Sequence, residues 1–290
     1  MKKLFPLSVF PVLCLMGAAP TYQNSVDHWR QDQEAALKAD DGWLTVVGLF
    51  WLKEGANTVG SDPASDVPLP RGPARAGIFE FHGGDATFQP SADAAALVNG
   101  QSATAAVRLK PDTDGKADIV SVGDLNMFVI HRGNRYGIRM RDTQSKLRKD
   151  FTGLHWYPVK DEYRVTADFV PYDAPRMIPV PNILGETGME ASPGFVVFPL
   201  HGQLYRLDPV VEDKELFFIF RDLTAGKETY ASGRFLHSEL PKDGKVVLDF
   251  NKAYNPPCAF TPYATCPLPP RQNRLPIHIE AGELNYGHHE

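Results

Sequence analysis

Alternation of apolar and polar residues is the dominant pattern along this chain, and it predicts a mainly β protein. The segment 135–141 alternates three apolar side chains with three arginines, and 246–251 alternates three apolar side chains with Val247, Asp249 and Asn251. Successive side chains of a strand point to opposite faces, so each segment is expected to form a strand with one core face. The 24 glycines and 25 prolines suit many short strands joined by turns.

Residues 43–142 contain the clearest hairpins. The run 43–52 is apolar enough for a buried strand, and a Gly83–Gly84 turn separates two short strands at 79–81 and 86–89. A Gly133–Asn134 turn joins 127–131 to 135–141 in a second hairpin, with Tyr136, Ile138 and Met140 on one face and Arg135, Arg139 and Arg141 on the other. We therefore expect a β-sandwich-like domain over 43–142.

The remainder, 143–290, is expected to be a second β-rich domain. Residues 143–158 mix charges with aromatics and should pack between the two domains. Strands are predicted at 163–169, 194–200, 204–207, 216–221, 228–230, 233–236 and 246–251. The run 216–221 is almost fully apolar and should be central, and the short spacings suit a curled sheet or small barrel.

One helix should precede the two antiparallel β units, within an N-terminal segment 20–42. Ser25 can cap a helix over 25–39, in which Val26, Trp29 and Leu37 share one side, and Asp40-Asp41-Gly42 ends it.

Residues 1–19 have the pattern of a cleavable signal peptide. Two lysines precede the apolar run 4–16, and Gly17-Ala18-Ala19 provides small residues for cleavage. The apolar run is too short to span a membrane, and no other stretch is suitable. A periplasmic or secreted protein is therefore expected. The formal net charge of -5 argues against nucleic-acid binding.

Export changes the interpretation of the cysteines, because Cys14 would leave with the signal peptide. Only Cys258 and Cys266 would remain, in a proline-rich loop, and in an oxidising compartment they predict a disulfide. The alternative is that the two cysteines are two of the four ligands of a zinc site. The histidines at 278, 288 and 289, however, lie at no recognisable ligand spacing. We therefore expect no metal.

Several C-terminal motifs resemble one bacterial family. They are Asp249–Phe260 (DFNKAYNPPCAF), Cys266–Pro270 (CPLPP), Asn273 and Ala281–Glu283, with Gly42–Leu52, Thr229–Tyr230 and Gly233–Phe235 upstream. The family is catalogued as domain of unknown function 1684, and the resemblance covers nearly the whole mature chain. It implies kinship but supplies no activity.

Residues 43–142 also resemble a forkhead-associated domain, a β-sandwich that binds phosphothreonine peptides. The motifs that carry this resemblance, in order, are 52–55 (LKEG), 58–60 (TVG), 65–69 (SDVPL), 98–100 (VNG) and 122–124 (VGD). Ser61 stands where that family usually has a phosphate-binding arginine, and the usual Ser-Arg-x-His turn is absent near 74–77. The resemblance therefore implies the fold of a degenerate domain and not phosphopeptide binding.

The chain has no nucleophile elbow, Walker loop, dinucleotide fingerprint or His-Glu-x-x-His motif, so no cofactor is expected. Polar residues at the predicted strand ends form the candidate ligand-binding set: Arg139, Asp142, Asp222, Tyr230, Arg234, Asp249, Asn251, Asn255 and Glu283. Each of them also has a structural interpretation, as a strand-end ion pair, a core tyrosine or a turn residue. We expect the functional surface to lie where Asp249 and Asn251 leave their strand, near Arg234.

The sequence leaves three functions open. The first is an exported binding module, a β-cup whose Arg, Asp and Asn groups hold a small polar molecule or a peptide. The second is a hydrolase-like enzyme that uses Asp249 and Glu283 as acid and base. The third is a structural accessory protein of the envelope. The pattern specifies neither the ligand nor the oligomeric state.

Overall fold

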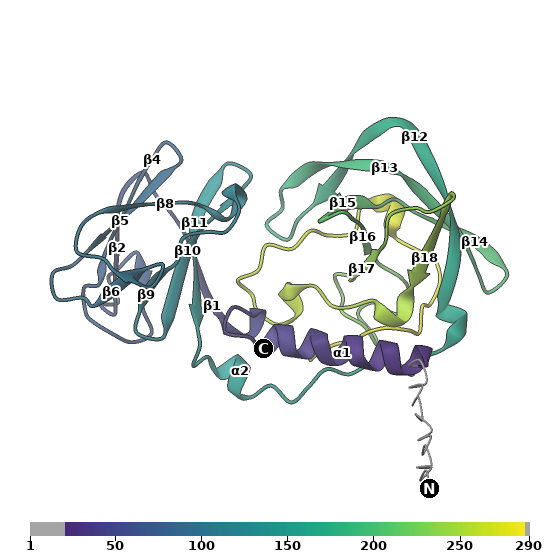
Figure 1. Ribbon diagram of the computed structural model, residues 1–290, viewed down its shortest axis with the longest axis horizontal. Coiled ribbons are helices and arrows are strands. Elements are labelled where there is room, and N and C mark those ends of the chain that lie inside the picture. Colours follow the sequence, from purple (N-terminus) through teal and green to yellow (C-terminus); the bar gives the residue numbers. More distant parts are fainter. Residues whose placement is uncertain (1–20, 288–290) are drawn as a thin grey trace, which may run out of the picture.

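The computed structural model describes residues 21–287, which form a mainly β protein with one long N-terminal helix (Figure 1). The strands fall into two groups along the chain, β1 to β11 and β12 to β18, and most of them pair antiparallel. The signal peptide predicted for residues 1–19 lies outside the described residues.

Two facing sheets form the N-terminal β unit. The six-stranded sheet has the order β1 (Val46–Trp51), β11 (Arg135–Asp142), β10 (Leu125–Arg132), β9 (Val120–Val122), β6 (Ala96–Val98), β7 (Gln101–Ser102). The five-stranded sheet has the order β3 (Val67–Pro68), β2 (Gly55–Gly60), β4 (Gly77–His82), β5 (Asp85–Pro90), β8 (Val107–Leu109). One core joins them, and it contains Phe79 and Phe88 of one sheet together with Ile138 and Met140 of the other.

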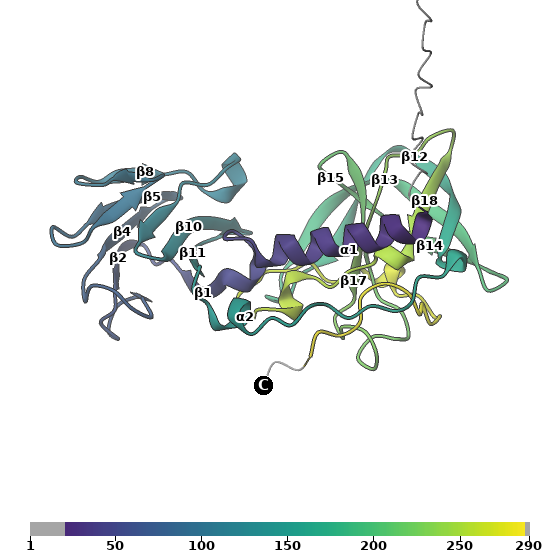
Figure 2. The ribbon, with the colours of Figure 1, turned by 60° about the horizontal axis from the view of Figure 1, so that its bottom comes forward.

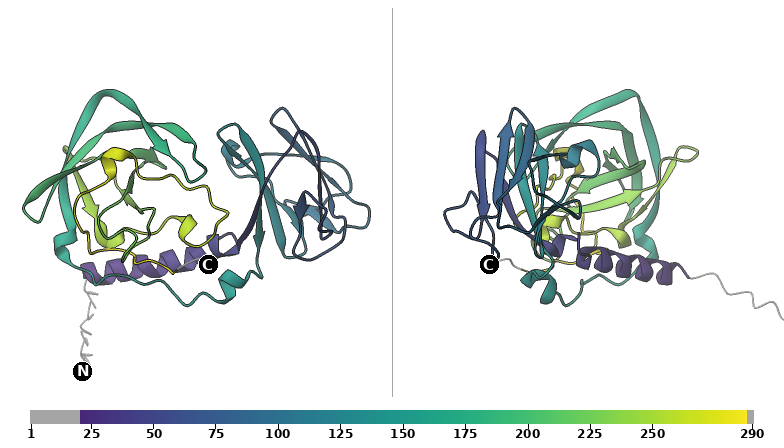
Figure 3. Two further views of the ribbon diagram at one scale, coloured as in Figure 1. Left: turned by 180° about the vertical axis from the view of Figure 1, so that it is seen from behind. Right: turned by 60° about the vertical axis from the view of Figure 1, so that its left-hand side comes forward.

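The alternation predicted for β11 is confirmed. Ile138 and Met140 are buried in the sandwich core, and Tyr136 packs against it. The three arginines occupy the opposite face, where Arg139 is 3% exposed. Arg139 is covered because the C-terminal unit lies beside this second face (Figures 1 and 3), whereas the Arg135 side chain on the same face is 41% exposed.

The C-terminal β unit consists of a curled four-stranded sheet and a three-stranded sheet. The curled sheet has the order β14 (Gln203–Leu207), β13 (Thr187–Leu200), β12 (Arg164–Pro181), β18 (Lys245–Asp249). The smaller sheet has the order β15 (Val210–Glu212), β16 (Glu215–Phe220), β17 (Arg234–Ser238). A register shift between Pro171 and Arg176 interrupts the β12–β13 ladder, and such irregularities bend a strand pair.

Strand β16 is central, as its apolar sequence predicts. Phe218 and Phe220 pack into the core under the curled sheet, whereas Phe217 and Ile219 pack on the other side, beneath the loop that carries both cysteines. Both faces of the strand are therefore covered, which is why it lacks polar alternation.

Helix α1 (Tyr22–Lys38) runs along one side of the molecule from the C-terminal unit toward the N-terminal one (Figure 2). Thr21 caps it, earlier in the chain than the start predicted at Ser25, because the Thr21 hydroxyl accepts a hydrogen bond from the Asn24 N–H at 3.3 Å. At its other end Gly42 approaches the helix so closely that an added Cβ would lie 2.3 Å from the Leu37 carbonyl oxygen. Glycine is thus required where the chain turns back.

The segment after β11 follows this helix. It contains a short helix, α2 (Lys146–Lys149), and then an extended stretch whose Leu154 N–H donates to Glu34 of α1 at 2.7 Å. The rings of Trp29 and Trp156 meet edge to face with centroids 5.7 Å apart. The segment therefore packs against α1 and is not a free linker.

Three predicted strands differ in the structure. The run 43–52 begins with a 3-10 turn at Trp43–Thr45, and only Val46–Trp51 form the strand. Residues 228–230 form turns, because the N–H groups of Lys227, Glu228 and Thr229 all donate to the Thr224 carbonyl. The strand predicted over 246–251 ends at Asp249, and Phe250–Lys252 form a 3-10 turn. Asn251 therefore does not share an exposed strand face with Asp249. Among residues 21–287, no helix combines the length and apolar character needed to cross a membrane.

Candidate functional site

Asp249 and Asn251 anchor helix α1. The Tyr22 hydroxyl donates to Asp249 Oδ1 at 2.7 Å and accepts from Asn251 Nδ2 at 2.9 Å. The Asn251 side chain also bridges the backbone of Lys160, accepting from its N–H at 3.0 Å and donating to its carbonyl at 2.9 Å. Asn251 is fully buried with its amide satisfied. Both residues therefore hold the helix in place, and neither lines the cavity described below.

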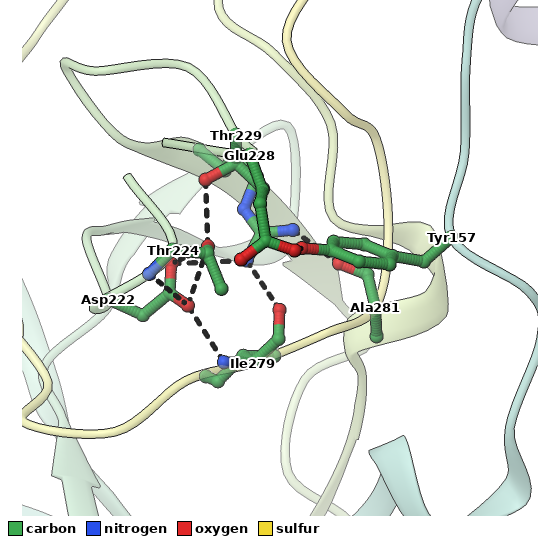
Figure 4. A network of polar contacts seen from close by, with 8 residues as sticks. Tyr157, Asp222, Thr224, Glu228, Thr229, Ile279 and Ala281 are labelled. Carbon is green, nitrogen blue, oxygen red and sulfur yellow. Dashed lines mark hydrogen bonds and ion pairs between the residues drawn. The ribbon is translucent and has the colours of Figure 1, made fainter. Parts of the chain in front are cut away.

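Arg234 and Asp222 form a buried ion pair, shown in part in Figure 4. Their side chains are each 1% exposed, and Arg234 Nη2 lies 3.1 Å from Asp222 Oδ1. The guanidinium also donates to the carbonyls of Ile279 and Ala281, and the Thr224 hydroxyl donates to Asp222. This network fastens the C-terminal segment to the end of β16, and it does not include Asp249.

Asp142 and Tyr230 also have structural partners. Asp142 accepts two hydrogen bonds from Arg71, at 2.6 and 2.7 Å, and not from Arg139. The neighbouring Arg71 guanidinium and the Gln144 N–H lower the pKa of Asp142. The Tyr230 hydroxyl donates to the Cys258 carbonyl at 3.1 Å.

The other three predicted residues, Arg139, Asn255 and Glu283, line one cavity. It has a volume of about 460 Å³, within the range of small-molecule sites. It lies where α1, the β10–β11 hairpin, the three-stranded sheet and the cysteine loop meet. Apolar side chains form much of its wall: Leu37, Trp43, Leu154, Phe217, Phe235 and Phe260.

Arg139 supplies the positive charge of this cavity. Its Nη2 donates to the Thr265 hydroxyl at 3.3 Å, its Cζ lies 5.0 Å from the centroid of the Trp43 ring, and its Nε has no hydrogen-bond partner. Burial, together with the nearby charge of Arg132, lowers the pKa of Arg139 to about 10. No carboxylate among residues 21–287 forms an ion pair with it.

Arg132 lies beside Arg139, but its charge is already paired with that of Asp112. Its guanidinium forms a two-pronged pair with Asp112, at 3.0 and 2.7 Å, while its Nε donates to Thr265 at 3.1 Å. The Thr265 oxygen thus accepts from both arginines, and its own hydroxyl hydrogen is left to donate.

Glu283 and Asn255 form the buried acidic part of the lining, which also includes the exposed Glu212. The Asn255 backbone N–H and Nδ2 each donate to a separate Glu283 oxygen at 2.8 Å, and both residues are 2% exposed. Burial raises the pKa of Glu283 to about 8 in spite of these bonds. The carboxyl is therefore mostly protonated at neutral pH.

Cys258 and Cys266 are buried free thiols in the structure, so the predicted disulfide is not formed there. The Cys258 N–H donates to Cys266 Sγ at 3.2 Å, which brings the two residues together. A hydrogen bond from the Cys266 thiol to the Cys258 sulfur, assisted by the nearby charge of Arg139, lowers the pKa of the Cys258 thiol. Cys266 lines the cavity.

Sequence reasoning missed several lining residues, among them Trp43, Arg132, Tyr254 and Thr265. Tyr254 lies within the recognised motif 249–260, and its hydroxyl lies 2.9 Å from His237 Nε2. Arg132 directly precedes the predicted Gly133–Asn134 turn and could have been found from that position. Trp43 likewise lies within the recognised motif Gly42–Leu52. Thr265 carries no local signal, since only the tertiary fold brings it to Arg139.

The hydrolase alternative required Asp249 and Glu283 to act together. Asp249 contacts Tyr22 and the Asn251 N–H, whereas Glu283 contacts Asn255, so the two carboxylates share no hydrogen-bond partner. Within residues 21–287 no group of three or more His, Cys, Asp or Glu side chains is arranged to hold a metal ion.

Comparison with known proteins bears on the C-terminal unit. Residues 149–284 match the model of a family described as "Protein of unknown function (DUF1684)". The match spans about half of the chain, not nearly its whole length as the motifs upstream suggested. The forkhead-associated resemblance of residues 43–142 rests on the sequence motifs alone.

Among solved structures, the chain is similar to the solution structure of an uncharacterized protein of Haloarcula marismortui. The two sequences are 33% identical over 47% of this chain and 78% of that one, with a TM-score of 0.40. None of the curated proteins compared with the chain matches it.

Proposed function

We propose that the protein binds a small organic anion in the cavity between its two β units. The observation that carries the proposal is Arg139, a guanidinium that is 3% exposed, lines this cavity and lacks a carboxylate partner among residues 21–287. Burying a charge is unfavourable unless it is paired, so an arginine kept in this state needs a counterion to offset its desolvation.

The donors around Arg139 suit a carboxylate or phosphate. A guanidinium has five N–H groups in a planar fork, and Arg139 uses one of them, toward Thr265. Its partnerless Nε can therefore form one prong of a two-pronged bond to an anion. The aromatic walls formed by Trp43, Phe217 and Phe235 would cover an apolar body attached to the anionic group.

Titration calorimetry with benzoate, 3-phenylpropanoate and inorganic phosphate tests this proposal. We expect at least one of these anions to bind, and Arg139→Met to weaken that binding by about 10- to 100-fold, the value of one charge-assisted hydrogen-bonded contact. Arg108→Met is the matched control, because Arg108 is an exposed arginine paired with Asp85. Its affinity should equal that of the unsubstituted protein. Equal binding by Arg139→Met, or no binding of any of the three anions, would overturn the proposal.

We propose further that this binding protein is exported. The basic start, apolar run and small residues within 1–19 support export. Expression of the full chain, cell fractionation and N-terminal sequencing test this: the exported fraction should begin at Pro20. A cytoplasmic product that retains Met1 would contradict it.

A further inference from the structure

Arg139 and Glu283 differ from the other buried charged residues described in the structure, because neither belongs to an ion pair. Six charged residues are buried within 21–287: Arg139, Asp142, Asp208, Asp222, Arg234 and Glu283. Asp142 pairs with Arg71, Asp208 with Arg206, and Asp222 with Arg234. The two that remain, one basic and one acidic, line the same cavity.

Arg139 and Glu283 do not form an ion pair with each other. The groups that act on Arg139 are chiefly Arg132 and Asp112, whereas those that act on Glu283 are Asn255, Arg234 and Glu34. The cavity therefore has a cationic pole at Arg139 and a separate acidic pole at Glu283.

Asn255 adds an unused acceptor to the acidic pole. Its Nδ2 donates to Glu283 Oε1 and to the Leu284 carbonyl, both at 2.8 Å. A carbonyl cannot donate, so the contact with Leu284 identifies this atom as the nitrogen and fixes the orientation of the amide. The Asn255 oxygen is consequently buried without a hydrogen-bond partner, in a residue that lines the cavity beside the Glu283 carboxyl group.

We propose that the ligand is a zwitterion, a molecule of amino-acid type that carries a protonated amine as well as an anionic group. This inference rests on the proposed function, in which Arg139 holds the anion. The ammonium group has three N–H donors, which the Asn255 oxygen and the Glu283 carboxylate can accept. Arg139 would then be paired with the anionic group of one molecule and Glu283, once it has lost its proton, with the amine of the same molecule, whose apolar side chain would lie against the aromatic wall.

Binding of such a ligand should release a proton. The charged and titratable groups around Glu283 are Arg234, Glu34 and Tyr254, and burial outweighs the favourable effect of Arg234. In the ligand-free protein Glu283 is mostly protonated at pH 7, since its pKa is about 8. An ammonium group beside it favours the carboxylate, so the carboxyl proton leaves when the amine enters.

Matched pairs of compounds test the acidic pole. L-leucine and L-phenylalanine are compared with 4-methylpentanoate and 3-phenylpropanoate, which lack only the amine. We expect calorimetry at pH 7 to give at least about tenfold tighter binding for the better amino acid than for its matched acid. Titrations in two buffers of different ionisation enthalpy should show close to one proton released with the amino acid and none with the acid.

Glu283→Gln should remove both differences, giving equal affinities for the paired compounds and no proton release. If the acids bind and the amine adds neither affinity nor proton release, the zwitterion is excluded while anion binding stands. If none of the four compounds binds, both proposals fall. The proton count for the unsubstituted protein decides the question even if the variant fails to fold.

Discussion

Asn255 holds both oxygens of Glu283, one through its backbone N–H and the other through its side-chain amide, each at 2.8 Å. Burial of this carboxyl raises its pKa in spite of the two hydrogen bonds, and this makes the stability of the protein depend on pH. The pKa of Glu283 is raised from 4.5 to about 8 on folding, so between these values the folded protein binds more protons than the unfolded chain. The contribution is fully present below about pH 4.5 and is lost as the pH rises toward 8.

We expect this residue to lower the free energy of unfolding by roughly 3–5 kcal/mol between pH 5 and pH 8.5, since a tenfold difference in proton affinity between the folded and unfolded states corresponds to about 1.4 kcal/mol. Urea unfolding at the two pH values measures it. Glu283→Gln cannot titrate, and its pH profile should lack this component. A variant that loses stability with pH as steeply as the unsubstituted protein would contradict the assignment.

Arg139→Met should stabilise the ligand-free protein, by about 1 kcal/mol. A buried cation without a counterion disfavours the folded state, as its lowered pKa indicates, and methionine fills a similar space without a charge. The bond to Thr265 and the contact with Trp43 are lost, which limits the gain. Thermal unfolding without added ligand measures the difference. A large fall in melting temperature would mean that Arg139 holds the two β units together and is not a ligand group.

Arg234→Met should be strongly destabilising because it leaves Asp222 buried without its partner. We expect a loss of about 3–5 kcal/mol, measured by urea unfolding. Arg108→Met, which breaks an exposed pair with Asp85, should change stability by less than about 1 kcal/mol. Equal losses of unfolding free energy for the two substitutions would show that the buried Arg234–Asp222 pair matters no more for stability than an exposed pair.

Cys258 and Cys266 should form a disulfide when the protein matures in an oxidising compartment. The closeness of the Cys258 N–H to Cys266 Sγ favours the bridge, and closing this short loop should stabilise the protein by roughly 2–3 kcal/mol. Mass spectrometry after alkylation of protein from the exported fraction measures the redox state, and unfolding with and without reductant measures the stabilisation. Two alkylated thiols in unreduced protein would disprove the bridge.

Local patterns were sufficient to predict most of the strands and their faces. The pleat of a strand fixes which side chains alternate, so the separation of Ile138 and Met140 from Arg139 followed from spacing alone. Spacing could not predict which other parts of the chain pack against each face. Arg139 reaches Thr265 across 126 positions of sequence, and nothing near either residue encodes the contact.

Asn251 shows a different kind of failure. Its spacing from Asp249 fitted a strand, but the Asp249 side chain accepts a hydrogen bond from the Asn251 N–H at 3.2 Å and starts a 3-10 turn instead. An aspartate side chain commonly accepts a hydrogen bond from the backbone N–H two residues later, and the turn that this bond forms competes with continuation of the strand. That local signal could have moved Asn251 from the candidate site into the interior.

The docking of helix α1 has a consequence for the order in which the molecule can be completed. Tyr22 bonds to Asp249, which lies 227 positions further along the chain, and Trp29 packs against Tyr254. A chain that emerges with its N-terminus first therefore carries this helix undocked until Asp249 and Tyr254, near the end of its sequence, are available. The sandwich of residues 46–142 can form early, but the cavity at Arg139 closes only when helix α1 packs against the segment that contains Asp249 and Tyr254.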